Sequence, residues 1–387
     1  MQLFDGENPT SEGTFTDGEP GSPHLASVPN AATLNAMLME LANMVTGSGL
    51  ALDAGDSTQV LQASRRIAGQ RADFTNALLN GDMEVWQRAT TFPAVGDTEF
   101  YTADRWYVRG DESLGAGNVV VTREQFDPGV TLDGVGFENY LRLNQSIAAT
   151  AGNPFLGQRV ESVRAWADGQ ATLSFWAKAT TALACAVQVE QNFGSGGSAA
   201  VMVHDESVTI GTTWQRYSFE ISLPNVVGKT VGLSNYLQAR LNLPTGLTYL
   251  CDTVGWQLEL GQKATPFVRR PFSVELRMCQ RFFEKSWGHE DPQSTATTAS
   301  QAVGMGLADA GYGVDTRFAA HKRAQPTLRF YSPVTGTIDK VRANGADQSV
   351  VGITGTGAAS TGYPSTSGGL SGHQAYTAHW TADAELY

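Results

Sequence analysis

"WQRYSFEISLP", residues 214–224, decides the fold class of this chain. Its apolar residues alternate with polar ones, which is the period-two pattern of a β-strand with one buried face. The same alternation recurs in "NYLQARLNLP" (235–244) and "GWQLELG" (255–261). Further strand-like runs, about ten in all, are separated by Gly, Pro, Asn and Asp turns between residues 76 and 270. The sequence therefore predicts an antiparallel jelly-roll β-sandwich over residues 76–270 in a mainly β protein.

Composition and charge narrow the classes of partner. The 387 residues are 41% hydrophobic and only 17% charged, with 42 glycines, which indicates many turns and few long salt-bridged helices. The net charge is −12 and the basic residues are scattered, so we expect no nucleic-acid partner. No apolar run approaches the roughly 20 residues of a membrane helix, and the start of the chain has no signal-peptide pattern, so we expect no membrane insertion and no conventional secretion.

The three cysteines, Cys185, Cys251 and Cys279, are far apart in apolar, strand-like contexts. We interpret them as reduced core residues, because isolated buried cysteines behave as small hydrophobes.

The segments before the sandwich differ from it in pattern. Residues 1–29 are rich in Gly, Pro, Ser, Thr and acidic residues, which predicts an extended arm. Residues 30–75 contain two short helical patterns, the first with one apolar stripe. The stripe consists of Leu34, Leu38, Leu41 and Val45. Because such short helices are marginal alone, the stripe either packs within the chain or joins copies of the chain, and we favour the second alternative.

Residues 271–387 contain strand-like pieces around a long Gly/Ser/Thr-rich run at 355–373. The run is too polar for a core, so it predicts a surface loop on a C-terminal β-rich tip domain.

Several stretches resemble the tail fibres or receptor-binding proteins of tailed bacteriophages. In the sandwich and beyond it these are "NGDMEVWQRATTF" (80–92), "YTADRWYV" (101–108), "WQLELGQKATPFVRRPFSVELRMCQRFFEKS" (256–286) and "TADAEL" (381–386). At the front they are "FTDGEPG" (15–21), "LNAMLMELANMV" (34–45) and "DSTQVLQA" (56–63). The stretches span most of the chain, and their order is more informative than any one of them.

The resemblance implies a homotrimeric adhesion protein of the virion, assembled in the cytoplasm of the host bacterium. Residues 1–29 would attach it to a tail or baseplate protein. A jelly roll similar to carbohydrate-binding modules would follow, and the C-terminal tip would contact a host-surface receptor, expected to be a glycan. No cofactor is required by this interpretation.

Catalytic motifs are absent from the sequence. There is no G-x-S-x-G elbow, H-E-x-x-H motif or P-loop, and the acidic residues are dispersed. We therefore expect binding rather than catalysis. The alternatives are a glycan hydrolase or depolymerase on the same particle, or a purely structural baseplate component.

A structural calcium ion is a further possibility that the resemblance suggests. Many carbohydrate-binding jelly rolls hold calcium between an "NG-x-E"-like first turn and an acidic residue on the last strand. The matching residues here are Asn80, Asp82, Glu84 and Asp252, whose oxygen atoms suit a hard cation. The alternative is ordinary polarity at a turn and a sheet edge.

Aromatic residues supply the candidates for receptor contact. Trp176 and Trp214 share their strand phase with polar residues, so they are expected to point outward, where they could meet either a sugar or another subunit. Trp86 and Trp106 are expected in the core.

The tip supplies a second group of candidates. It consists of Tyr363, His373, Tyr376, His379 and Trp380. Their alternative role is the trimer seam. We expect the loop to make the contact and the final strand to provide structure.

Overall fold

The computed structural model describes residues 21, 25–28, 30–48, 50–70, 76–95, 98–110, 119–148, 154–306, 312–313, 317–354, 356–360, 363–366 and 375–387. The chain divides into two compact units, residues 1–75 with 261–263 and residues 76–260 with 264–387. The four-part division predicted from the sequence is finer than these units and stays a prediction. Most of the predicted arm, 1–29, lies outside the described residues. No helix in the described ranges is long and apolar enough to span a membrane.

The first unit contains two helices, α1 (Ala31–Gly47) and α2 (Gln59–Gln70), which contact each other. Asn30 caps α1, because its Oδ1 accepts a hydrogen bond of 2.8 Å from the Thr33 backbone N–H. Val45 is buried. The other three residues of the predicted stripe, Leu34, Leu38 and Leu41, are exposed. Contact between the helices of one chain therefore leaves most of the stripe uncovered, and the packing of copies stays a prediction.

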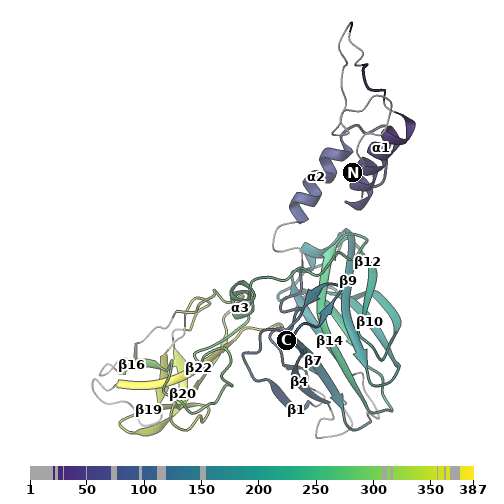
Figure 1. Cartoon of the computed structure of the whole chain (residues 1–387). Helices are drawn as coiled ribbons and strands as arrows, with labels where there is room; N and C mark the ends of the chain where they lie inside the picture. Colours follow the sequence, from purple (N-terminus) through teal and green to yellow (C-terminus); the bar gives the residue numbers. More distant parts are fainter. Residues whose placement is uncertain are drawn as a thin grey trace. The chain divides into compact units, whose positions relative to one another are not determined.

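The second unit begins with a sandwich of two six-stranded antiparallel sheets (Figure 1). The first sheet has the order β1 (Thr91–Val95), β4 (Val119–Gln125), β7 (Asn139–Gln145), β14 (Tyr249–Leu260), β9 (Gly169–Ala179), β12 (Gln215–Leu223). The second has the order β11 (Val201–Ile210), β10 (Leu183–Asn192), β13 (Tyr236–Asn242), β8 (Phe155–Glu161), β3 (Tyr107–Arg109), β2 (Phe100–Tyr101). A small hairpin of β5 (Thr131–Leu132) and β6 (Val135–Gly136) and a 3₁₀ turn, η1 (Val163–Trp166), connect strands. The predicted mainly β, antiparallel fold is confirmed.

The period-two pattern of β12 has the predicted consequence. The four apolar residues of this strand are buried, and they are Tyr217, Phe219, Ile221 and Leu223. The polar residues between them are exposed or half-buried, so one face of the strand packs on the core. β12 pairs with β9 along its whole length, which covers its backbone groups on that side.

Large aromatic rings fill the centre of the sandwich. The Trp256 ring stacks on Phe175 with centroids 4.0 Å apart and lies 5.1 Å from Trp106. Trp86 is also buried, and its indole N–H donates to the Met83 carbonyl at 2.7 Å. The predicted core role of Trp86 and Trp106 is confirmed.

The three cysteines also lie in apolar interiors. All are buried and free, as predicted. Burial raises the pKa of each thiol, that of Cys185 to about 12.

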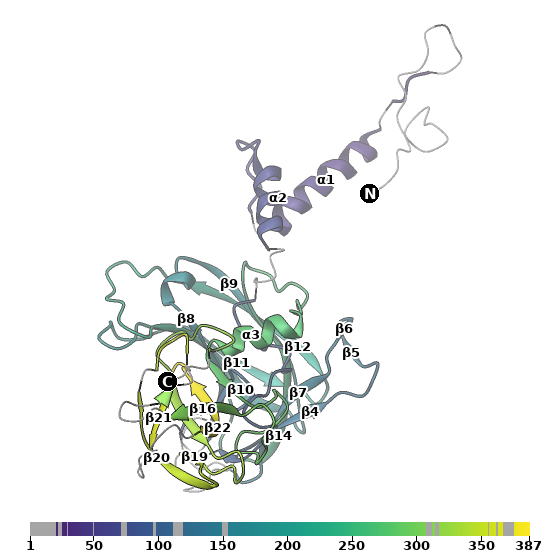
Figure 2. The same cartoon turned by 90° about the vertical axis from the view of Figure 1, so that its left-hand side faces the viewer.

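The rest of the second unit consists of α3 (Phe272–Gln280) and an eight-stranded sheet, drawn in green and yellow in Figure 2. The main path of the sheet is β17 (Tyr312–Gly313), β16 (Ala302–Gly306), β22 (Ala375–Asp383), β19 (Lys340–Ala343), β20 (Ala346–Thr354), β21 (Tyr363–Thr366). β15 (Phe283–Lys285) and β18 (Thr327–Tyr331) pair with β22 off this path. β22 therefore pairs with β15, β16, β18 and β19 and organises the sheet.

A buried arginine cluster from the first strands of the sandwich holds the end of the chain. Arg105 pairs with Glu385, and Arg88 Nη2 lies 3.3 Å from the same carboxylate. The Tyr101 hydroxyl donates to the Leu386 carbonyl at 2.7 Å. Segments that are almost 300 residues apart in sequence are thus joined, which gives a structural role to the arginines near residues 80–108.

Candidate functional site

A row of polar side chains crosses the outer face of the first sheet. The strand register places Thr122 of β4 opposite Arg142 of β7. Arg142 also lies opposite Asp252 of β14, and Asp252 lies opposite Lys178 of β9. Residues one position away along these strands, such as Leu143, are in the core. Because side chains alternate between the faces of a strand, these four residues, the outer-face row, point away from the core.

Three aromatic rings stand beside the outer-face row. Trp214 lies 5.2 Å from Phe126 and 5.4 Å from Tyr140, measured between ring centroids, and Phe126 lies 4.9 Å from Tyr140. Phe126 and Trp214 are half-buried, so parts of their rings remain accessible. The Lys178 Nζ is 5.1 Å from the Trp214 centroid, within the range of a cation–π contact. We call these three rings the aromatic triad.

Ion pairs fix the geometry of the row. Arg142 donates from Nε and Nη2 to the two oxygens of Asp252, at 2.7 and 2.9 Å. This is the bidentate geometry that gives arginine its specificity for carboxylates. Lys178 Nζ lies 3.5 Å from the same carboxylate. The hydrogen bond to Asp252 raises the pKa of Arg142, and burial followed by the charge of Asp252 raises the pKa of Tyr140.

Two adjoining pockets extend from the row toward the ends of the strands. The first, about 220 Å³, is lined by Arg142, Lys178 and Asp252 together with Thr180 and Leu250. The second, about 320 Å³, shares Thr180 and Leu250 and is lined further by hydroxyl and amide side chains. Those side chains are Asn144, Gln145, Ser146 and Thr248. Together the two pockets form a polar groove beside the aromatic triad.

The arrangement can recognise a molecule that has apolar faces and many hydroxyls. The rings of Trp214 and Phe126 offer surfaces on which an apolar face can lie. Lys178 and Arg142 are donors, while the carboxylate, hydroxyls and amides of the groove supply acceptors and further donors. Because Asp252 is already neutralised by two cations, the row has no large net charge that would demand an ionic ligand.

Two predicted contact residues on the same face have different surroundings. Trp214 belongs to the aromatic triad and is half-buried, so part of its ring faces outward as expected. Trp176 is only 2% exposed, because Phe137 and Phe267 pack against it and Arg216 lies over its ring, with the guanidinium carbon 4.6 Å from the centroid. The prediction that Trp176 offers a ring to a ligand is therefore wrong. The outward side of its strand is covered by the same chain.

The aromatic residues of the final strand are also buried. Tyr376, His379 and Trp380 are each at most 3% exposed. His379 and Trp380 are neighbours on opposite faces of β22, so both faces of the strand are covered. The prediction that these residues bind a receptor is wrong. They instead support the sheet, which is the structural role that was expected for the final strand. Tyr363 lies in β21, but its side chain is not described, and His373 lies outside the described residues. Both stay predictions.

The predicted calcium ligands are not brought together. Asp252 sits in the outer-face row, bound by Arg142. Asn80 is fully buried, with its side chain accepting a hydrogen bond from the Val85 N–H and donating to the Val85 carbonyl, both at 2.8 Å. In the part of the chain that the structure describes, no group of three or more His, Cys, Asp or Glu side chains is placed to hold a metal ion. The four-residue calcium site is therefore wrong as predicted.

Asp82 and Glu84 do lie near each other, on the other side of this turn. Arg269 lies 3.6 Å from Asp82 and 3.4 Å from Glu84. Burial, followed by the charges of Glu275 and Glu84, raises the pKa of Asp82 to about 7. The presence of a structural calcium ion stays a prediction.

Sequence reasoning missed Tyr140, Arg142 and Lys178. The signal was present in "YLRLNQS" (140–146), where Tyr140, Arg142 and Asn144 alternate with buried leucines. The alternation predicts that the three side chains share one face. It does not predict which residues of other strands lie beside them, since that depends on strand order.

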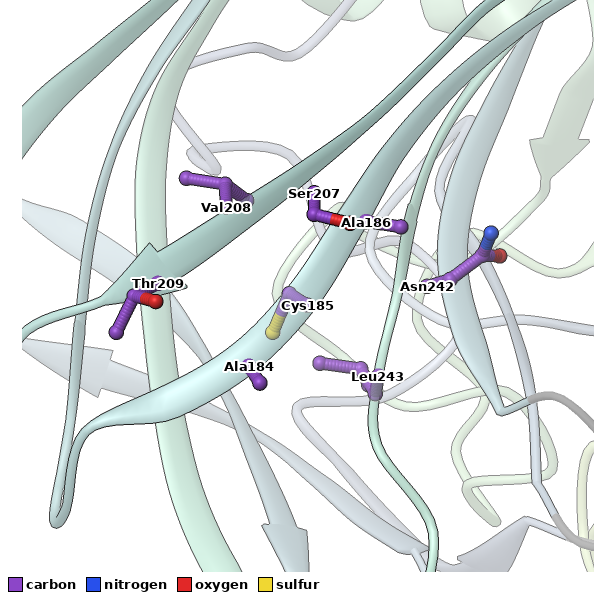
Figure 3. Close-up of a pocket in the computed structure, with 8 residues that line it drawn as sticks. All are labelled: Ala184, Cys185, Ala186, Ser207, Val208, Thr209, Asn242 and Leu243. Carbon is purple, nitrogen blue, oxygen red and sulfur yellow. The ribbon is translucent and has the colours of Figure 1, made fainter.

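A further pocket, about 330 Å³, lies on the second sheet between β10, β11 and the end of β13 (Figure 3). Its lining consists of Ala184, Cys185, Ala186, Ser207, Val208, Thr209, Asn242 and Leu243. These side chains are small and uncharged and include no aromatic ring. The pocket therefore lacks the stacking surface and the charged donors of the groove.

Comparisons with known proteins return only structural likenesses. No family model matches the chain, and no curated protein matches it. A CBM4 structure is 19% identical, with 47% of this chain and 97% of that chain covered and a TM-score of 0.31. A family 11 carbohydrate-binding module from Clostridium thermocellum, in complex with a β-1,3-1,4-mixed-linked tetrasaccharide, is 11% identical, with 45% and 99% covered and a TM-score of 0.27.

The enzymatically active domain of tailspike protein 4 from bacteriophage CBA120 is also similar. It is 14% identical, with 49% of this chain and 22% of that chain covered and a TM-score of 0.29.

Proposed function

We propose that this chain binds a glycan with the outer face of its sandwich, along the outer-face row and the aromatic triad. The observation that carries the proposal is the position of Trp214 and Phe126 beside Arg142, Asp252 and Lys178, above a polar groove. Rings provide the apolar contact, and the ion-paired side chains provide fixed hydrogen-bonding groups that lose little entropy on binding.

Binding rather than catalysis is the proposed activity. Glycoside hydrolysis commonly needs one carboxyl to donate a proton and another to act as base or nucleophile. Asp252 instead forms ion pairs with Arg142 and Lys178, which occupy its oxygens. Such a carboxylate suits the positioning of hydroxyl groups.

The biological setting that we propose is a homotrimeric phage tail fibre. The order of the phage-like stretches supports it, as do the exposed leucines Leu34, Leu38 and Leu41 on α1, which could be covered by other copies. Residues 1–29 would then attach to a tail or baseplate protein, in the virion. Three copies would multiply a weak glycan contact by effective concentration.

The experiment is a screen of the full-length chain on an array of bacterial surface polysaccharides, followed by calorimetric titration with the glycan bound most strongly. Trp214→Ala should weaken binding at least tenfold, and Arg142→Gln should weaken it as well. Phe272→Ala, which removes an exposed ring from α3, is the matched control and should leave binding unchanged.

Retention of full affinity in both Trp214→Ala and Arg142→Gln would overturn the proposed site. Release of reducing ends from the bound polysaccharide would overturn the proposal of binding without catalysis.

A further inference from the structure

A pocket of about 400 Å³ lies within the second unit, between the first strands of the sandwich and the C-terminal sheet. Two rings in its lining are substantially exposed, Phe100 at 46% and Tyr387 at 70%. The opposite lining comes from β18 and the segment that follows it, with Tyr331 and Ile338. The volume lies in the range of small-molecule sites and is large enough for one or two sugar rings.

The exposed rings are held in place by buried neighbours. Phe100 packs edge-on against Phe92, with centroids 5.5 Å apart. Tyr387 packs against the buried Tyr101 at 5.4 Å, and its hydroxyl donates to Asp383 at 3.0 Å. A ligand would therefore meet two preorganised aromatic surfaces at a low entropic cost.

The charged groups of the pocket are balanced in sign. Arg88 and Arg329 are opposed by Glu99 and Asp383. An anionic ligand would meet both carboxylates, and a cationic one would meet both guanidinium groups. A neutral ligand with many hydroxyls can instead donate to the carboxylates and accept from the arginines.

Arg88 is held firmly in the wall of the pocket. Its guanidinium lies 3.7 Å from the Phe283 ring centroid, and its Nη2 reaches Asp383 at 3.2 Å. Its side chain is only 6% exposed, yet Nη1 has no hydrogen-bond partner among the described residues. Because Nη1 is itself buried, Arg88 gives the pocket wall rigidity, and the exposed lining groups make the contacts with a ligand.

We propose that this pocket, which we call the junction pocket, is a second saccharide-binding site that takes a neutral sugar. It shares no residue with the outer-face row or the groove, so the proposal stands or falls separately from the first site. Each chain would then contact a polysaccharide at two places, one on the sandwich and one beside the C-terminal sheet. Two such contacts on one polymer raise the apparent affinity without a stronger individual contact.

The experiment uses the full-length chain and two neutral probes, β-1,4-galactotriose and a β-1,3-1,4-mixed-linked tetrasaccharide, at millimolar concentrations. Saturation-transfer NMR detects binding, and titration gives the dissociation constant. Phe100→Leu keeps the apolar contact with Phe92 but removes the ring, and Tyr387→Ala removes the second ring. Val227→Ala, at a position that is 85% exposed elsewhere on the sandwich, is the control.

We expect binding of at least one probe that is weakened tenfold or more by Phe100→Leu and by Tyr387→Ala, but unchanged by Trp214→Ala and Val227→Ala. Binding that only Trp214→Ala removes would leave the first site standing and overturn the junction pocket. If the wild-type chain binds neither probe, the junction pocket is overturned as a neutral-sugar site. Circular dichroism of each variant shows that a loss of binding does not come from unfolding.

Discussion

The ion pair between Arg270 and Glu275 gives the sharpest test of how the second unit is held together. Both side chains are at most 4% exposed, and Arg270 Nη1 lies 2.9 and 3.2 Å from the two oxygens of Glu275. Arg270 also donates to the Leu78 carbonyl, and Glu275 accepts from the Asn80 N–H at 2.6 Å. The pair thus joins the start of α3 to the first residues of the sandwich.

The change is Glu275→Gln, which keeps an oxygen that can accept from Asn80 but removes the charge. The guanidinium of Arg270 is then buried without a counter-charge, and breaking such a pair costs about 3–5 kcal/mol. We expect a loss of this size in the free energy of unfolding. For a unit of about 300 residues, this loss corresponds to a fall in melting temperature of about 5–8 °C.

The assay is urea unfolding followed by tryptophan fluorescence at pH 7, for the wild type, Glu275→Gln, Arg270→Met and the variant with Arg270→Met and Glu275→Leu together. Replacing both charges with apolar groups should recover most of the loss, because neither charge is then left alone. A Glu275→Gln loss below about 1 kcal/mol would show that the buried pair does not hold the second unit together. So would a double variant whose loss equals the sum of the single losses.

Three further predictions concern single side chains. Asp82→Asn should remove a pH dependence of stability, because the pKa of Asp82 in the folded state is raised to about 7. As the pH rises from about 4 to 7, the free energy of unfolding of the wild type should fall by on the order of 4 kcal/mol relative to the variant. Urea unfolding measures this difference, and the same pH dependence in both proteins would contradict it. Leu38→Asp should convert a trimer to monomers in light scattering of the full-length chain, since Leu38 is exposed on α1; an unchanged mass would show that α1 does not join copies. Gly255→Ala should cost about 2–5 kcal/mol in thermal unfolding, because Gly255 has a φ of +68° and an added Cβ would meet the Trp176 ring, whereas a neutral effect would refute the tight approach.

The opening stretch of the sandwich shows where sequence reasoning reached and where it stopped. The burial of Trp86 and Trp106 was predictable from their size and apolar surface. The role of the neighbouring arginines was not predictable from the sequence. Arg88 and Arg105 bind Glu385, and nothing in the local pattern indicates a partner so distant in the chain. Only strand order and packing bring the start of the sandwich and the last residues of the chain together.

The four predicted calcium ligands do not come together, for a related reason. Asn80, Asp82 and Glu84 are adjacent in a turn, so their proximity was a local property. Asp252 was added by resemblance, and its place in the sheet put it opposite Arg142 and Lys178 instead. Opposite charges on the two neighbouring strands give Asp252 the role of an ion-pair partner.

The strands and the direction of their side chains follow from the local sequence pattern, because alternation is set by the backbone geometry of a strand. Trp176 and Trp214 were both correctly placed on the outward phase. Only the tertiary structure decided that Trp176 is covered by Phe137 and Phe267 while Trp214 stays half-exposed beside Lys178. Exposure depends on segments that are distant in sequence, since a loop that packs over an outward face buries it as completely as the core would.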